Sequence, residues 1–300
     1  MSRPLHRSSV WAVADQPSGA QRQGRYLPAA IAHPGKMLPA LARQAIETYS
    51  QPGQLVLDPM CGIGTTLVEA THLDRHAIGV ELEQRWATLA AANLNHARCQ
   101  GATGHGLALQ GDARQLGRGL LDEYRGQAAL ILTSPPYGPS LHGHVRKTAE
   151  RVVKFNDRYS RNPDNLAHLP TEPGRRGRPS FDAVLAEILA GCKRMLTPEG
   201  RLVMTVRPYR HAGRLINLPA QLEQLAADNG LALYDRHAAL LCGLRGGKLV
   251  PRASFFQIRI QRSGHFPRML IIAHEDVLVF KLAQTRLSSR NLNNRRSGTR

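Results

Sequence analysis

The residues best suited to chemistry follow a short apolar run, Ala128 to Leu132, which predicts a buried strand. Directly after it come Thr133, Ser134, two prolines and Tyr137. Two prolines in a row end the pairing of a strand, because proline has no N–H group and a fixed φ. The chain therefore leaves the sheet at Ser134. A hydroxyl, a rigid carbonyl and an aromatic ring then lie at the carboxyl end of a strand, where open α/β sheets bind ligands.

A second stretch with chemical potential is a glycine turn between a predicted strand, residues 54–58, and a predicted helix, residues 65–73. Gly62 and Gly64 allow a tight turn and the close approach of a ligand, and the helix that follows offers unpaired N–H groups. Leu67 stands where a dinucleotide fingerprint needs a small residue, which disfavours a pyrophosphate site. The carboxylate of Asp58 would repel a phosphate but could hold an ammonium group.

Acidic residues also end the next two predicted strands, residues 76–81 and 107–113. Glu81 follows Asp58 by 23 residues, a spacing at which a carboxylate can accept hydrogen bonds from both ribose hydroxyls. Asp112 could accept from an adenine amino group. Each acid alone could simply cap a loop or a helix. Three acids at successive strand ends lie on one edge of a parallel sheet, and together they indicate a nucleoside site.

The rest of the chain keeps an α/β rhythm, which predicts a mostly parallel sheet with helices on both faces. Apolar periodicity and capping residues predict helices over residues 39–49, 84–97, 181–196 and 217–229. A turn is predicted over residues 197–200, and strands over residues 201–207, 231–241, 254–260 and 273–280. Residues 1–28 and 283–300 are polar or basic without periodicity, and we expect them to be disordered arms. The main domain then spans residues 29–282.

The formal net charge is +18 and the sequence pI is about 10.8. Such an excess indicates a polyanionic partner, although basic tails on an ordinary protein would also raise it. No apolar run is long enough for a membrane span. The four scattered cysteines and the polar N-terminus fit a reducing cytoplasm. His142 and His144 lack a third ligand at metal-binding spacing, so we expect no metal.

Two polar stretches, residues 138–180 and 242–272, are predicted insertions over the edge of the sheet that carries the acids. The first contains basic residues interleaved with aromatic ones, a composition suited to binding phosphates. A solvated loop is the alternative. The expected nucleic-acid contacts are Arg146, Lys147, Arg151, Lys154, Arg158 and Arg161.

Taken together, the motifs resemble the S-adenosylmethionine-dependent amino-methyltransferases that act on the N4 of cytosine or the N6 of adenine in DNA. The resemblance covers residues 31–282 and implies a Rossmann-like class I methyltransferase fold with a seven-stranded sheet. It rests on the sequence from His33 to Pro39, the glycine turn, the acids at the strand ends, the Ser-Pro-Pro-Tyr tetrapeptide and a final strand from His274 to Phe280.

The resemblance also implies a role for each motif. Ser134, Pro135, Pro136 and Tyr137 would be catalytic. The residues expected to bind S-adenosyl-L-methionine are His33, Lys36, Asp58, Met60, Cys61, Gly62, Gly64, Thr65, Glu81, Asp112 and Thr133. Serine in the first place of the tetrapeptide is commoner in the cytosine-N4 group, so DNA and N4 of cytosine are favoured, and the protein would work in the cytoplasm at the nucleoid.

Three alternatives stay open at this point. A tRNA guanine-N2 methyltransferase has a similar fold and tetrapeptide, usually with aspartate first. An inactive relative could bind nucleic acid without catalysis, although the intact acids and tetrapeptide argue against it. Methylation of a small molecule or of protein glutamine also uses a Pro-Pro-Tyr loop, but the strong positive charge disfavours it.

Overall fold

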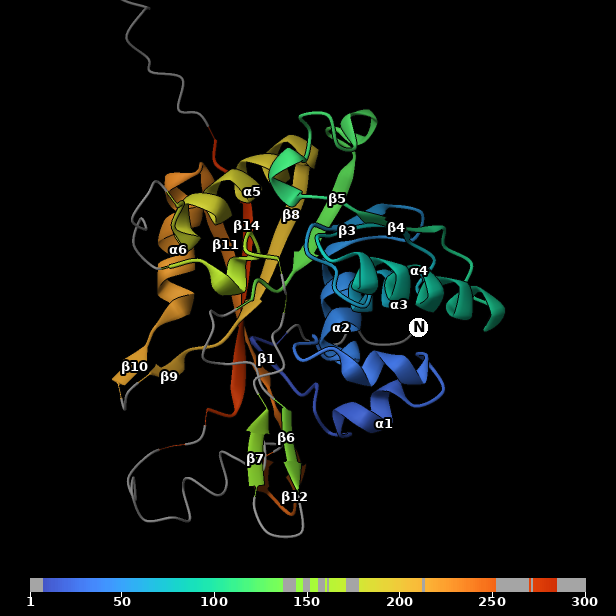
Figure 1. Ribbon diagram of the computed structural model, residues 1–300, viewed down its shortest axis with the longest axis vertical. Helices are drawn as coiled ribbons and strands as arrows, with labels where there is room; N and C mark the ends of the chain where they lie inside the picture. Colours follow the sequence, from blue (N-terminus) through green and yellow to red (C-terminus); the bar gives the residue numbers. More distant parts are fainter. Residues whose placement is uncertain are drawn as a thin grey trace, which may run out of the picture.

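The computed structural model describes residues 8–136, 144–147, 152–155, 160, 162–170, 178–211, 214–251, 270 and 272–284. The centre of the molecule is an eight-stranded sheet in the order β1-β11-β14-β8-β5-β2-β3-β4 (Figure 1). Its strands are β1 (Val10–Trp11), β2 (Leu55–Asp58), β3 (His76–Glu81), β4 (Gly106–Gln110), β5 (Ala128–Thr133), β8 (Leu196–Val206), β11 (Leu231–Leu240) and β14 (His274–Leu282).

The sheet is mostly parallel. Strands β4, β3, β2, β5 and β8 run in one direction, and only β14 runs against its neighbours β8 and β11. From β2 the chain moves outward to β3 and β4, then returns to the other side of β2 to form β5. Such a reversal of strand order opens a crevice at the carboxyl ends of the two central strands. The predicted Rossmann-like α/β fold is therefore confirmed.

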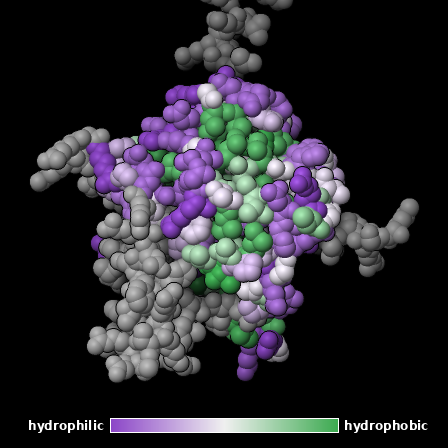
Figure 2. Space-filling model, turned by 45° about the vertical axis from the view of Figure 1, so that its right-hand side comes forward, coloured by the Kyte–Doolittle hydropathy of each residue, from purple (hydrophilic) through white to green (hydrophobic). Residues whose placement is uncertain are grey.

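Helices cover both faces of the sheet. α2 (Pro39–Tyr49), α3 (Thr65–His72) and α4 (Gln84–Cys99) lie on one face, and α5 (Phe181–Met195) and α6 (Leu218–Asp228) on the other (Figure 1). Alternate residues of one strand enter opposite cores: in β5, Leu130 and Leu132 pack with α2, whereas Ile131 packs with α5. On the face that Figure 2 shows, hydrophobic residues form a band between hydrophilic margins.

Local sequence signals explain where these helices begin. Pro39 is the first residue of α2, and proline suits this position because its missing N–H group would be unpaired there. The hydroxyl of Ser180 accepts a hydrogen bond from the Ala183 N–H group at 3.2 Å, and Asn217 caps α6 in the same way. The predicted bounds of these helices agree with the structure to within about two residues. The expected turn over residues 197–200 instead lies inside β8, at a register shift against β5.

We expected residues 1–28 to be disordered, but the structure shows ordered elements in residues 8–28. Residues 8–28 carry β1 and α1 (Ser18–Arg22), and the side chains of Trp11 and Tyr26 are buried. β1 pairs in parallel with β11, which adds an eighth strand to the seven that the sequence predicted. The apolar residues of this segment have no regular spacing, so periodicity gave no sign of the contacts that hold them.

Three two-stranded hairpins and four short 3-10 helices complete the described chain. The hairpins are β6 (His144–Lys147) with β7 (Val152–Phe155), β9 (Tyr209–His211) with β10 (Arg214–Ile216), and β12 (Cys242–Arg245) with β13 (Lys248–Pro251). The 3-10 helices are Pro28–Ala32, Ala113–Gln115, Asp122–Tyr124 and Leu166–His168. The predicted strand over residues 254–260 and the tail after residue 284 lie outside the described residues. Within the described part of the chain, none of the helices has the length and apolar character needed to cross a membrane.

Candidate active site

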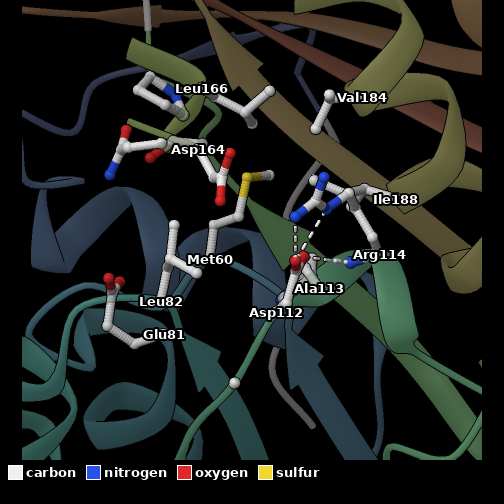
Figure 3. A pocket seen from close by; sticks show the side chains of 15 residues that line it. Met60, Glu81, Leu82, Asp112, Ala113, Arg114, Asp164, Leu166, Val184 and Ile188 are labelled. Atoms are coloured by element: carbon white, nitrogen blue, oxygen red, sulfur yellow. Dashed lines mark hydrogen bonds and ion pairs between the residues drawn. The ribbon is translucent and has the colours of Figure 1, made fainter. Parts of the chain in front are cut away.

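A cleft opens where the strand order reverses, at the carboxyl ends of β2, β3 and β5 (Figure 3). It contains about 550 Å³ of empty space, solvent included, which is within the usual range for a small-molecule site. Residues from six parts of the chain line it: Pro59, Met60, Glu81, Leu82, Gly111, Asp112, Ala113, Arg114, Ser134, Pro136, Asp164, Asn165, Leu166, Val184 and Ile188.

The predicted catalytic segment forms one wall of this cleft. Ser134 and Pro136 are half-buried and line the cleft, whereas Thr133 and Pro135 are buried behind them. The sheet pairing ends at Thr133, as the tandem prolines predicted. Tyr137 lies outside the described residues. The hydroxyl of Ser134 thus shares a cavity with two of the three predicted acids, Glu81 and Asp112.

The third acid, Asp58, lies beneath the cleft rather than in its lining. Its carboxylate is 4% exposed and accepts hydrogen bonds from the Thr66 hydroxyl at 2.7 Å and the Met60 N–H group at 3.1 Å. Burial raises the pKa of Asp58 to about 6, and these hydrogen bonds limit the rise by favouring the charged form. Asp58 therefore acts on the cleft by fixing the loop that presents Met60.

Glu81 lines the cleft and also fixes the glycine turn. Its two carboxylate oxygens accept hydrogen bonds from the N–H groups of Gly62 and Glu83, each at 2.9 Å. Burial raises the pKa of Glu81 to about 7, against the effect of these two hydrogen bonds. The free lone pairs of the two oxygens are the acceptors available to a ligand with two hydroxyl donors.

Asp112 is held within its own turn at the rim of the cleft. It accepts from the N–H group of Arg114 at 2.9 Å, and the Arg114 guanidinium pairs with the other carboxylate oxygen at 2.5 Å (Figure 3). The carboxylate thereby keeps one orientation towards the cleft. This arrangement uses part of its accepting capacity and leaves the remainder for a donor on a ligand.

The glycine turn itself depends on two left-handed residues. Gly62 has φ +53° and Gly64 has φ +81°, a region that favours glycine. A Cβ atom on Gly62 would lie 3.3 Å from Nε2 of His33, and one on Gly64 would lie 3.1 Å from Cβ of Ala90. Of the residues predicted in this turn, Met60 reaches the cleft, as Figure 3 shows, whereas Cys61, Gly62, Gly64 and Thr65 are not among its lining residues.

His33 and Lys36 also lie away from the cleft lining. The His33 ring is buried against Gly62 and meets the Trp86 ring edge-on, with 4.6 Å between ring centroids. The Lys36 ammonium donates to the carbonyl oxygens of Ile31 and His33, and burial lowers its pKa to about 8. The structure thus connects both residues with the glycine turn through packing and the backbone.

Sequence reasoning missed the wall of the cleft formed by Asp164, Asn165 and Leu166. This wall falls within residues 138–180, which we expected to lie over the edge of the sheet as a polar insertion. Here the insertion returns to the core, because Leu166 is buried and the Ser160 hydroxyl donates to the Glu83 carboxylate. The signal in the sequence was the group of apolar residues Leu166, Ala167 and Leu169 in an otherwise polar stretch.

The six predicted phosphate-binding residues are not tested by the structure. Arg146, Lys147 and Lys154 belong to β6 and β7, of which only the backbone is described. Arg151, Arg158 and Arg161 lie outside the described residues. Among the side chains that the structure does describe, no group of three or more could hold a metal ion.

Comparisons with known proteins agree with the family that the motifs indicated. A family model described as DNA methylase matches residues 2–92. The Type II methyltransferase M.SmaI of Serratia marcescens is 47% identical over 51 residues, which are 17% of this chain and 18% of that protein. These matches confirm the predicted resemblance to the DNA amino-methyltransferases in the part of the chain that holds the glycine turn and Glu81. They also confirm S-adenosyl-L-methionine as the predicted cofactor.

Other relatives act on RNA according to their names. The tRNA (guanine(10)-N2)-dimethyltransferase of Methanothermobacter thermautotrophicus is 32% identical over 126 residues, 42% of this chain and 34% of that protein. The chain thus spans about a third of the length of this relative. Among solved structures, TrmN from Thermus thermophilus aligns with a TM-score of 0.47 and 19% identity, covering 87% of this chain and 53% of that one.

Proposed function

We propose that this protein is a methyltransferase that moves a methyl group from S-adenosyl-L-methionine to an exocyclic amino group of a base in DNA, with N4 of cytosine as the favoured target. The observation that carries the proposal is the shared cleft: Ser134 and Pro136 face the same cavity as Glu81 and Asp112. A cofactor held by the two acids would thereby lie beside the hydroxyl that meets the substrate.

The residues present fit this cofactor. Glu81 offers two ordered carboxylate oxygens for the ribose hydroxyls, and Asp112 offers an acceptor at the rim for the adenine amino group. The methionine end of the cofactor would meet the turn that begins at Met60, which Asp58 holds in place. When bound, the cofactor supplies a methyl group that is already activated by its sulfonium charge.

The protein would contribute acceptors and positioning to the reaction. An exocyclic amino group is a poor nucleophile, because its lone pair is delocalised into the ring. The Ser134 hydroxyl and the Pro135 carbonyl would accept the two amino protons and turn that lone pair towards the methyl group. Because the tandem prolines hold the segment rigidly, little reorganisation is needed. Tyr137 would stack on the base after it has left the duplex.

This scheme needs hydrogen-bond acceptors at the amino group and no strong general base. The assignment of His33 and Lys36 to cofactor binding becomes indirect in this proposal, because both support the glycine turn from behind. The basic residues on and beside β6 and β7 remain proposed phosphate contacts. An enzyme of this kind would work in the cytoplasm beside the nucleoid.

A specific observation favours a second substrate, tRNA. Two tRNA (guanine(10)-N2)-dimethyltransferases match over 126 and 130 residues, against 51 residues for M.SmaI. DNA stays the first proposal because of the DNA methylase match and the M.SmaI match. The serine at position 134 supports it too, since the tRNA group normally has aspartate there.

The experiment is methyl transfer from isotopically labelled cofactor to duplex DNA and to total tRNA, followed by mass spectrometry of the nucleosides. Labelled N4-methylcytosine from DNA is the expected product. Labelled N2-methylguanine from tRNA alone would overturn the DNA proposal and support the second one. If neither product forms although calorimetry shows that the cofactor binds, the protein is an inactive relative that binds nucleic acid.

A further inference from the structure

The hairpin formed by β12 and β13 leaves the sheet at the edge that carries the cleft. β11 runs antiparallel to β14, and β14 runs antiparallel to β8, so β11 ends at the same edge as β8 and β5. β12 begins two residues after β11 ends at Leu240. Figure 1 shows this hairpin extending past that edge.

The two faces of the β12–β13 hairpin differ in character. Leu244 and Leu249 are cross-strand partners, 52% and 56% exposed. The next pair towards the tip, Arg245 and Lys248, is also exposed. Because neighbouring residues of a strand point to opposite faces, the two leucines lie on one face and the two cations on the other. The first residue of the hairpin, Cys242, is 2% exposed, so the hairpin starts from the buried core.

The tip is narrow and unobstructed. Gly246 and Gly247 have φ values of +51° and +71°, which suits the two-residue turn of a hairpin. A Cβ atom added at either glycine would meet no atom within 4 Å. Because Cys242 and Gly243 are buried, the exposed part of the hairpin has two residues in each strand and projects about 7 Å before its turn, close to the depth of the DNA major groove, about 8.5 Å.

The charge of the segment favours nucleic acid as the partner. The segment from residue 241 to residue 251 contains two cations and no acid, on a chain of formal charge +18. A protein partner for an exposed leucine pair would not require this excess, whereas a polyanion does. The major groove of B-form DNA admits a two-stranded ribbon and offers thymine methyl groups to apolar side chains. The major groove of A-form RNA is too deep and narrow for such a ribbon.

We propose that the β12–β13 hairpin enters the major groove of duplex DNA beside the target base, with Arg245 and Lys248 on backbone phosphates and Leu244 and Leu249 against base edges. This inference rests on the proposed function for its choice of DNA. It assigns recognition to residues 242–251, in addition to the basic residues expected between residues 138 and 180.

The test compares two double variants by fluorescence anisotropy on duplex DNA across a range of salt concentrations. Arg245→Gln with Lys248→Gln should weaken binding and lower the slope of log K against log salt by about 2, the share of two phosphate contacts. Leu244→Ser with Leu249→Ser should leave that slope unchanged. Replacing thymine by uracil should weaken wild-type binding about fourfold, the worth of one buried methyl group, and should not affect the leucine variant.

Matched controls lie on a distant part of the surface. Leu107→Ser removes an exposed leucine from β4, at the far edge of the sheet, and Arg98→Gln removes an exposed cation from the end of α4. Both should bind DNA like the wild type. Unchanged cofactor affinity in calorimetry will show that every variant is folded.

Three outcomes would overturn the inference. The salt slope could be unchanged in the cation variant. The leucine variant could still lose about fourfold in affinity when thymine is replaced by uracil. The variants could lose as much affinity for duplex RNA as for duplex DNA. A protein that binds DNA in the expected way but methylates no nucleic acid would instead refute the proposed function and leave the hairpin assignment intact. The two proposals can therefore fail separately.

Discussion

The two halves of the central sheet use their charged residues differently. Along β2 and β3, the acids at the strand ends are held by hydrogen bonds from the residues that follow these strands: Asp58 by Met60 and Thr66, and Glu81 by the N–H groups of Gly62 and Glu83. Along β8 and β11, hairpins leave the same edge with exposed leucines and cations. The first half is preorganised for a small ligand, whereas the second presents a surface to a large one.

The N-terminal segment belongs to the preorganised half. The buried Glu69 carboxylate of α3 pairs with Arg25 at 2.6 Å and Arg43 at 3.1 Å and accepts from the Tyr26 hydroxyl at 2.7 Å. These contacts dock residues 18–32 on the helix that follows the glycine turn. Each prediction below changes one half of the molecule and asks whether the other half responds.

The largest expected effect is on the substrate side of the cleft. Ser134→Ala removes a proposed acceptor of the amino protons, so turnover should fall about 10²–10³-fold, or ~3–4 kcal/mol in activation free energy. The cofactor should bind within about twofold of wild-type affinity, because Glu81 and Asp112 remain. Single-turnover methylation and calorimetry measure the two quantities. A variant that keeps most of its rate would show that Ser134 has no such role.

The next effect is on stability. Glu69→Gln leaves the partly exposed guanidinium groups of Arg25 and Arg43 beside a neutral amide, and the free energy of unfolding should fall by about 2 kcal/mol, the worth of hydrogen bonds to a charged group. Urea denaturation measures this change. Glu47→Gln, on the exposed face of α2, is the matched control and should change stability by less than about 0.5 kcal/mol. Equal stability of the two variants would mean that the N-terminal segment is not docked through Glu69.

A pH dependence should follow from Glu81, whose pKa is raised from 4.5 to about 7 in the folded protein. Between these values the folded state holds a proton that the unfolded chain releases, so the stability of the ligand-free protein should fall as pH rises. Glu81→Gln should make this slope less steep by up to ~1.4 kcal/mol per pH unit. Urea unfolding from pH 4.5 to 7 measures the slope.

Glu81 should also make cofactor affinity depend on pH, with affinity rising where stability falls. Ribose hydroxyls need the charged Glu81 carboxylate as an acceptor, so cofactor affinity should rise with pH through about 7. In Glu81→Gln any remaining rise should lie near pH 6, where Asp58 titrates. Calorimetry of both proteins with one ligand removes the titration of the ligand from the comparison. Parallel pH profiles would exclude Glu81 from the cofactor site.

The smallest effect tests the link between the N-terminal segment and the glycine turn. The buried Asn93 amide accepts from the Leu27 N–H group at 3.0 Å and donates to the Ile63 carbonyl at 2.9 Å. Asn93→Leu keeps about the same side-chain volume and loses both bonds, so cofactor affinity should fall about fivefold, or ~1 kcal/mol. The kcat at saturating cofactor should not change. Asn95→Leu, on an exposed position of α4, is the control.

Most elements of the sheet and its helices were predictable because their signals are local. Apolar periodicity marked α2 and α5, and an acid at the end of β3 marked Glu81 before any contact was known. The eighth strand was not predictable, because β1 has two residues and exists only through its pairing with β11. The position of Asp164 in the cleft was not predictable either, because it depends on a segment that packs against the core through Leu166.

The order of residues by itself determined the α/β rhythm, the rigid kink after Thr133 and the acids at the strand ends, because backbone geometry and side-chain chemistry act over a few neighbours. Tertiary structure decided how those acids are used. Folding buries Asp58 beneath the loop, holds Glu81 against the Gly62 backbone, and brings Asp112 to the cleft of Ser134. The relations of Glu81 to Gly62 and of Asp112 to Ser134 join residues about 20 positions apart, and only the assembled sheet brings them within hydrogen-bonding distance of one another or of a shared ligand.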